Sequence, residues 1–248
     1  MIEIDATFLL ACLIILVATI VAGLAGFGLS ILSVPPLLLL YDPATVISLN
    51  KILTLGTTWV IVVEAWRHIS WRWIARILPT GLVGLLVGTW LLRALDSNVI
   101  KVIAGAIVIA LAVLLLSWQP RAVRERPWMG PAVGLVSGTS STAVGMAGPP
   151  IVLFFTVMGV SKEVFRATTA TYFVASDVVG LPTLISQGIV GGEDLRLSLA
   201  LAPIALVGRL IGIRLVPHVS PRAFRRATLA LLLVTGSVSV VTGLGALP

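Results

Sequence analysis

Apolar runs, most of them near the length needed to cross a bilayer, follow one another from residue 7 to residue 245, and this pattern constrains the fold more than any other feature of the chain. About 20 consecutive apolar residues are needed to cross roughly 30 Å of hydrocarbon. The pattern therefore predicts an all-α polytopic membrane protein. Composition agrees, because only 11% of the residues are charged, against about a quarter in soluble domains.

Ten elements are predicted. Three of them, at 28–41, 128–140 and 147–158, are too short for a comfortable crossing, and all three flank a break rich in Gly, Ser or Pro. These short elements can be full crossings, half-crossings or re-entrant segments. The other predicted elements are 7–24, 45–66, 73–93, 98–118, 164–187, 196–216 and 222–245.

The two halves of the chain resemble each other. SVPPLLLLY at 33–41 matches AGPPIVLFF at 147–155, an offset of 114 residues. Further landmarks follow in the same order at an offset of 124: Pro79, Gly84 and Gly88 match Pro203, Gly208 and Gly212. We infer an internal duplication with repeats at 1–120 and 121–248, which together form one membrane domain. An odd number of crossings per repeat inverts the second repeat in the membrane.

The basic residues predict an orientation. They cluster at 67–76, 121–126 and 209–226, between apolar runs. With five elements per repeat and both termini outside, all three clusters face the cytoplasm, as the positive-inside rule requires. A model with four crossings per repeat would export one of these clusters. The formal charge of +7 then reflects orientation in a cell (inner) membrane and contact with lipid phosphate, and we expect no nucleic-acid partner.

Two breaks interrupt the apolar pattern, at Gly23–Gly28 and Ser137–Gly145. An unpaired peptide group in hydrocarbon costs several kcal/mol, so both breaks should face protein or a water-filled cavity. Pro35-Pro36 and Pro149-Pro150 suit the first turns of the helices that follow. The free N–H groups at such helix starts can bind an anion. The alternative is that the small residues serve helix packing, the role we expect for the GxxxG pairs Gly84/Gly88 and Gly208/Gly212.

The candidate substrate-binding residues lie in the two breaks and at the start of the third element. They are Gly26, Phe27, Gly28, Ser30, Ser33, Pro35, Asn50, Lys51, Ser137, Thr139, Ser140, Ser141, Thr142, Gly145, Gly148 and Pro149.

Four charged residues within or beside predicted crossings are further candidates, because charges inside a membrane are expensive and usually functional. Asp177 can carry a coupling proton, or it can pair with Arg209 or Lys51. Lys51 can hold an anion, or its side chain can snorkel to the outer interface. Arg166 can recruit anions from the cytoplasm, or it can anchor its helix. The single Cys12 excludes an internal disulfide, and no metal site is expected.

The segments GLAGFGLSILSVPPLLLL and SGTSSTAVGMAGPPIVLFF resemble the TauE/SafE family of sulfite exporters, which repeats a Gly-rich segment and a Pro-containing apolar helix in both halves. The resemblance covers residues 8–245. It implies movement of small sulfur-containing anions: sulfite, sulfoacetate or other organosulfonates. The hydroxyl-rich second break and the first break, which departs somewhat from the family pattern, can contribute unequally.

The leading hypothesis is therefore a secondary transporter, an exporter that works by alternating access, has no cofactor and is not an enzyme. No P-loop is present, so ion or voltage gradients must supply the drive. Alternatives are an anion channel and a membrane-embedded lipid-phosphate enzyme. Catalysis is disfavoured because 20–36 and 134–151 contain no ionisable side chain. Proton or ion coupling and a homodimer are further expectations.

Overall fold

The computed structural model of the chain describes residues 5–117, 125–215 and 221–245, and these residues form helices and no strands. This confirms the predicted all-α class. Within the described residues, five helices are long and apolar enough to cross a membrane: α1, α3, α4, α5 and α9. The helices are α1 (Ala6–Ala25), α2 (Leu29–Leu37), α3 (Pro43–Glu64), α4 (Trp71–Ala94), α5 (Ser97–Ser117), α6 (Met129–Ala143), α7 (Gly148–Met158), α8 (Lys162–Ser186), α9 (Gly192–Leu215) and α10 (Pro221–Gly245), with a 3-10 turn, η1 (Trp66–His68), before α4.

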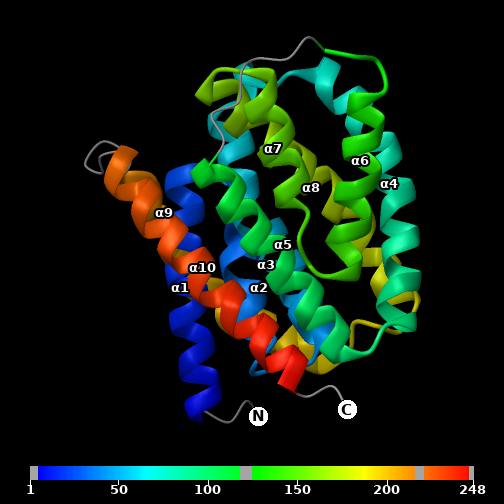
Figure 1. Cartoon of the computed structure of the whole chain (residues 1–248), viewed down its shortest axis with the longest axis vertical. Coiled ribbons are helices and arrows are strands. Elements are labelled where there is room, and N and C mark those ends of the chain that lie inside the picture. The colour runs from blue at the N-terminus through cyan, green and yellow to red at the C-terminus, as the bar shows by residue number, and fades with distance from the viewer. Residues whose placement is uncertain (1–4, 118–124, 216–220, 246–248) are drawn as a thin grey trace.

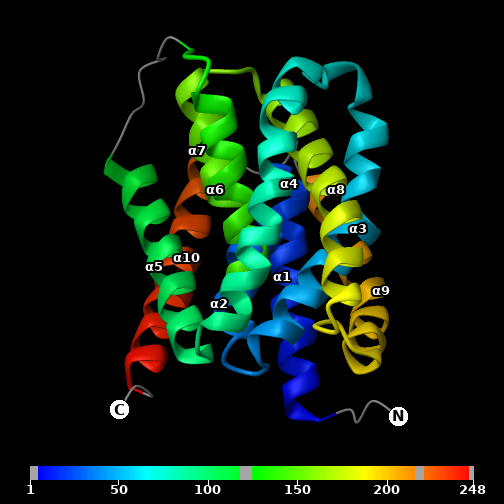
Figure 2. The same cartoon turned by 90° about the vertical axis from the view of Figure 1, so that its right-hand side faces the viewer.

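The short helices are arms of two hairpins that return to the side from which they enter (Figures 1 and 2). The hairpin α1–α2 enters from the end of the molecule that carries both termini, and α6–α7 enters from the opposite end. Helices α2 and α7 have 9 and 11 residues, which corresponds to about 14 and 17 Å. Neither helix can cross the hydrocarbon core alone, so the re-entrant alternative describes these elements.

The long helices pair in a pattern that stays the same when each helix of the first half is exchanged for the helix at the same place in the second half. Helix α1 packs along α9 as α6 packs along α4, while α5 packs on α10 and α3 on α8. The GxxxG glycines lie in the first two interfaces. A Cβ atom at Gly88 would overlap the carbonyl oxygen of Thr139, and one at Gly212 would overlap that of Ile20. These glycines therefore serve close helix packing, as expected.

Replacing Gly88 by valine should destabilise the protein, because helix α6 would have to move away from α4. Overpacking of this kind typically costs about 1–3 kcal/mol. We expect a lower thermal unfolding midpoint for Gly88→Val in detergent. Gly56→Ala is the matched control, because Gly56 lies within α3 with nothing near its missing Cβ. A Gly88→Val protein as stable as Gly56→Ala would contradict this packing.

The two helix breaks are shorter than the sequence predicted. Helix α1 continues to Ala25, and α6 continues through the hydroxyl-rich run to Ala143. Left-handed glycines then turn the chain, Gly26 at φ 83° and Gly145 at φ 76°. These two glycines lie 119 residues apart, as do the starts of α3 and α8. An offset of 119 residues therefore fits these landmarks better than the 114 of the Pro-Pro match.

The predicted position of Pro35-Pro36 is wrong. Gly28, at φ 111°, ends the first break, so α2 begins at Leu29 and the two prolines fall in its last turn. They help to end the helix, because they cannot donate backbone hydrogen bonds. Pro149-Pro150 lies in the first turn of α7, as predicted.

Candidate functional site

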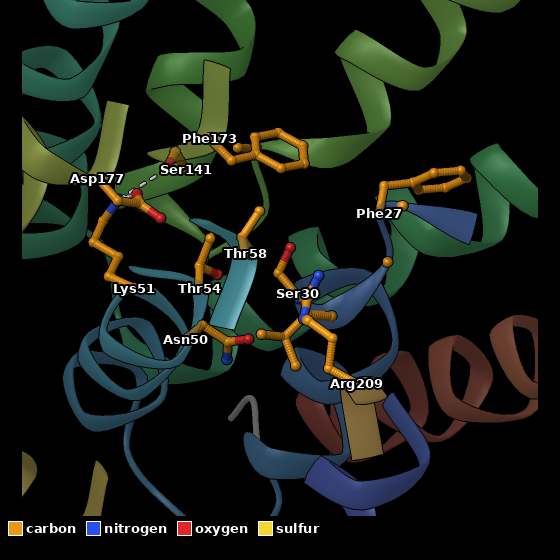
Figure 3. Close-up of a pocket in the computed structure, with 15 residues that line it drawn as sticks. Phe27, Ser30, Asn50, Lys51, Thr54, Thr58, Ser141, Phe173, Asp177 and Arg209 are labelled. Carbon is orange, nitrogen blue, oxygen red and sulfur yellow. Dashed lines mark hydrogen bonds and ion pairs between the residues drawn. The ribbon is translucent and has the colours of Figure 1, made fainter. Parts of the chain in front are cut away.

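A cavity lies where the two helix breaks meet in the interior of the bundle. Figure 3 shows side chains from α2, α3, α6, α8 and α9 around it. The cavity is narrow: the centre of a water-sized sphere can occupy about 30 Å³, and about 480 Å³ is free of protein atoms when the open mouth is counted. It is lined by Gly26, Phe27, Gly28, Leu29, Ser30, Asn50, Lys51, Thr54, Thr58, Ser141, Gly145, Ala147, Phe173, Asp177 and Arg209.

Arg209 brings a positive charge to this cavity without a negative partner. Its exposed fraction is only 2%, and its Nε and Nη1 atoms have no hydrogen-bond acceptor. Among the residues that the structure describes, no carboxylate forms an ion pair with Arg209. Of the two partners expected for Asp177, Arg209 is therefore not the one observed. A buried cation with free donors is expensive, and an anion in the cavity would offset that cost.

Asp177 pairs with Lys51 instead. The Lys51 Nζ atom lies 2.8 Å from Asp177 Oδ1 and 2.9 Å from Ser141 Oγ. The side chains of Lys51 and Asp177 are 4% and 9% exposed, so the snorkelling alternative for Lys51 is wrong. Opposite charges this close to each other contribute little net charge to the cavity. Arg209 is therefore the uncompensated charge in the cavity wall.

The first break adds polar groups beside Arg209. Gly28 caps α2 without a side-chain hydrogen bond, so the first N–H groups of the helix lack intrahelical acceptors. Arg209 reaches from α9 toward Ser30 and Asn50 (Figure 3). The Asn50 amide is held in place, because its Oδ1 accepts from Ser33 Oγ at 2.7 Å and its Nδ2 donates to the Val46 oxygen at 3.0 Å. Ser33 thus orients Asn50 and does not itself line the cavity.

Most hydroxyls of the second break hold the break together. Ser137 Oγ donates to the Ala147 oxygen, Ser140 Oγ to the Met146 oxygen, each at 2.7 Å, and Thr142 Oγ1 to the Leu85 oxygen at 2.8 Å. The first two bonds join α6 to the chain of the break, and the third joins α6 to α4. Of the predicted residues in this half, Ser141 and Gly145 line the cavity, while Thr139, Gly148 and Pro149 do not. Pro35 of the first half lies outside the lining as well.

The two breaks therefore offer different groups. Helix α7 begins with Gly148-Pro149-Pro150, and prolines have no N–H to present. Helix α2 has no proline in its first turn. The second half has more hydroxyls, but the first half presents more free amides beside Arg209.

Arg166 lies behind the first break, outside the cavity lining. Its Cγ lies against Gly26, where an added Cβ would collide with it. Its Nη2 contacts Glu64 Oε2 at 3.2 Å, while its buried Nε has no partner. The Phe27 and Phe165 rings stack edge to face beside it, with centroids 5.3 Å apart. Both expectations for Arg166, anion recruitment and helix anchoring, stay predictions.

Sequence reasoning missed part of the lining. Thr54 and Thr58 follow Asn50 at four-residue intervals on α3, and Phe173 precedes Asp177 by four on α8. Helical periodicity, counted from the predicted residues Asn50 and Asp177, would have identified these three residues. No group of three metal-ligating side chains occurs in the part of the chain that the structure describes.

Comparison with known proteins assigns the chain to a family. The model of the family described as Sulfite exporter TauE/SafE matches residues 11–238. The chain belongs to this family. TauE/SafE proteins are exporter-type membrane transporters, so the chain is a multi-pass membrane transporter and not an enzyme.

Two curated relatives support the assignment. The chain is 25% identical over 227 residues, 89% of its length and 88% of the relative's, to the probable sulfite/organosulfonate exporter TauE of Cupriavidus necator. It is 28% identical over 172 residues, 68% of its length and 72% of the relative's, to the probable inner membrane transporter protein TsaS of Comamonas testosteroni. No solved structure matches the TauE/SafE chain significantly.

Proposed function

We propose that this transporter exports sulfite or small organosulfonates, and that the anion binds at Arg209 in the cavity between the two helix breaks. The observation that carries the proposal is the buried guanidinium of Arg209, which lacks a carboxylate partner among the described residues. The amides that begin α2, together with Ser30 and Asn50, add neutral donors. Charge-assisted hydrogen bonds of this kind are about twice as strong as neutral ones. The substrate class rests on the family and on the names of the relatives.

The proposed mechanism is alternating access between two inverted repeats. Support comes from the hairpins, which enter from opposite ends, and from a helix pairing that survives exchange of the halves. The two breaks meet at the cavity, so a rocking motion of one repeat against the other would open it first to one side and then to the other. A homodimer stays a prediction.

The proposed orientation places both termini outside the cell and the basic segments in the cytoplasm. The turn η1 with the start of α4, and the start of α6, lie at the end of the molecule opposite the termini. Arg121 and Arg124 lie outside the described residues. In an inner membrane with a negative interior, this orientation follows the positive-inside rule. Export of a monoanion then gains about 2.3 kcal/mol per 100 mV.

A proteoliposome screen with sulfite, sulfate, thiosulfate, sulfoacetate and taurine tests the function. We expect saturable flux of sulfite or an anionic sulfonate, and trans-acceleration of labelled anion by unlabelled anion. Trans-acceleration is the signature of a carrier that alternates between two states. Flux that is linear in concentration without counterflow would establish a channel, and no flux of any anion would overturn the proposal.

A further inference from the structure

Three hydroxyl groups on α8 are buried without a hydrogen-bond partner: Thr169 Oγ1, Tyr172 Oη and Ser176 Oγ. Their residues are 0%, 1% and 1% exposed. The Tyr172 hydroxyl lies near Ser137, whose own hydroxyl donates to the Ala147 oxygen at 2.7 Å. A buried polar group without a partner typically costs about 1–3 kcal/mol. Three in one helix call for an explanation in terms of function.

These hydroxyls form a stripe along α8, called here the hydroxyl stripe. The intervals of three and four residues place them on one face of the helix. Thr171 and Thr183 of the same helix, by contrast, donate to the Ala167 and Val179 oxygens, each at 2.8 Å. The residue after Ser176 is Asp177, which contacts Lys51 at the cavity wall. From Thr169 to Asp177 the helix rises about 12 Å.

We propose that this hydroxyl stripe conducts protons between the level of Thr169 and Asp177, and that protonation of Asp177 strengthens anion binding in the cavity. A hydroxyl both donates and accepts, so it can pass a proton along a hydrated chain. The proton converts the Asp177 carboxylate to a neutral acid. Lys51 keeps its own proton and charge, and its charge is then no longer balanced. The proposal rests on the proposed function, because it requires an anion in this cavity.

The surroundings of Asp177 support this coupling. Lys51 of α3 is the charged group in contact with it, and Arg209 of α9 lines the same cavity. Helix α6 contributes Ser141 to the Lys51 side of the pair. Helix α4 contributes the apolar Leu85 next to Gly180, and α8 itself contributes Tyr172. Taking up one proton raises the summed charge of Lys51, Asp177 and Arg209 from one positive charge to two, which favours an anion.

Equilibrium binding tests the coupling site. Sulfoacetate is the probe, because both its acidic groups stay ionised between mildly alkaline and mildly acidic buffer. We expect the wild type to bind sulfoacetate about tenfold more tightly at the acidic end. A neighbouring charge typically shifts the pKa of a carboxyl group by one unit or more. By linkage, protonation of that group changes the affinity for the neighbouring anion by the same factor. Asp177→Asn mimics the protonated acid and keeps an acceptor for Lys51. It should bind tightly at both pH values, and a wild-type pH response in this variant would overturn the proposal.

Transport rates test the stripe itself. Tyr172→Phe removes a hydroxyl that has no partner and keeps the ring, so the variant should fold. We expect the uptake rate driven by a pH gradient to be at least about tenfold lower in this variant than in the wild type. It should keep the pH dependence of binding, and also counterflow when the pH is equal on both sides. Thr171→Val, whose hydroxyl is satisfied by its own helix, should behave like the wild type.

Two outcomes separate this inference from the proposed function. If Tyr172→Phe and Ser176→Ala both keep the wild-type gradient-driven rate while counterflow persists, the hydroxyl stripe is not a proton path and the transport function stands. If the wild type shows no counterflow with any anion of the screen, the proposed function and this inference fall together.

Discussion

Replacing Arg209 by glutamine is expected to abolish anion transport while the protein still inserts and folds. Each hydrogen bond from a charged donor contributes about 1.5–3 kcal/mol, so the loss of two should weaken binding at least about 100-fold. The same change should raise the thermal unfolding midpoint of the protein without substrate. The reason is that the guanidinium is buried without an acceptor at Nε or Nη1. If Arg209 served only the fold, its replacement would not raise the unfolding midpoint while weakening anion binding.

Arg214→Gln is the matched control for Arg209→Gln. Arg214 lies on the same helix in its last turn, is exposed, and does not line the cavity. We expect its transport rate and anion affinity to match those of the wild type. Wild-type affinity in Arg209→Gln would contradict the proposed site. A lower unfolding midpoint in that variant would show that Arg209 has a partner in the resting protein.

Replacing Asp177 by leucine is expected to destabilise the protein strongly, because Lys51 would be left as a buried charge without its counter-ion. Breaking a buried ion pair from one side costs about 3–5 kcal/mol. The double variant Lys51→Met/Asp177→Leu removes both charges and should recover most of the lost stability. Thermal unfolding and size-exclusion profiles in detergent measure both effects.

The double variant also separates the Lys51–Asp177 pair from the anion site. Since Arg209 remains, anion binding should persist without its pH dependence. A double variant as unstable as Asp177→Leu would show that the cost does not arise from the unpaired lysine. Loss of all anion binding in a stable double variant would show that Lys51, and not Arg209 alone, holds the anion.

The sequence predicted the helices well because their signal is local. Apolar runs and breaks follow from hydropathy and from Gly and Pro, and all ten elements occur within a few residues of their predicted spans. The ends of the breaks were harder to predict. Ser140 and Thr142 were predicted as break residues, but α6 stays helical to Ala143, and their hydroxyls donate to the Met146 and Leu85 oxygens.

The charged residues of the candidate site were predicted but their partners were not, because pairing between distant helices is not a local property. Asp177, Lys51 and Arg209 stand out as charges in apolar sequence, and all three line the cavity. Which of them form a pair depends on how α3, α8 and α9 pack, and the sequence does not encode that by spacing. The Pro-Pro match suggested a register of 114 residues, whereas the left-handed glycines Gly26 and Gly145 lie 119 residues apart.

The central claim is that an anion binds between Arg209 and the first turn of α2. Anomalous diffraction from crystals grown with selenite, whose selenium replaces the sulfur of sulfite, tests this claim most directly. We predict a selenium peak inside the cavity, with selenite oxygens within hydrogen-bond distance of the Arg209 guanidinium. Occupied selenium sites found only outside the cavity, with Arg209 still lacking an anion, would contradict it.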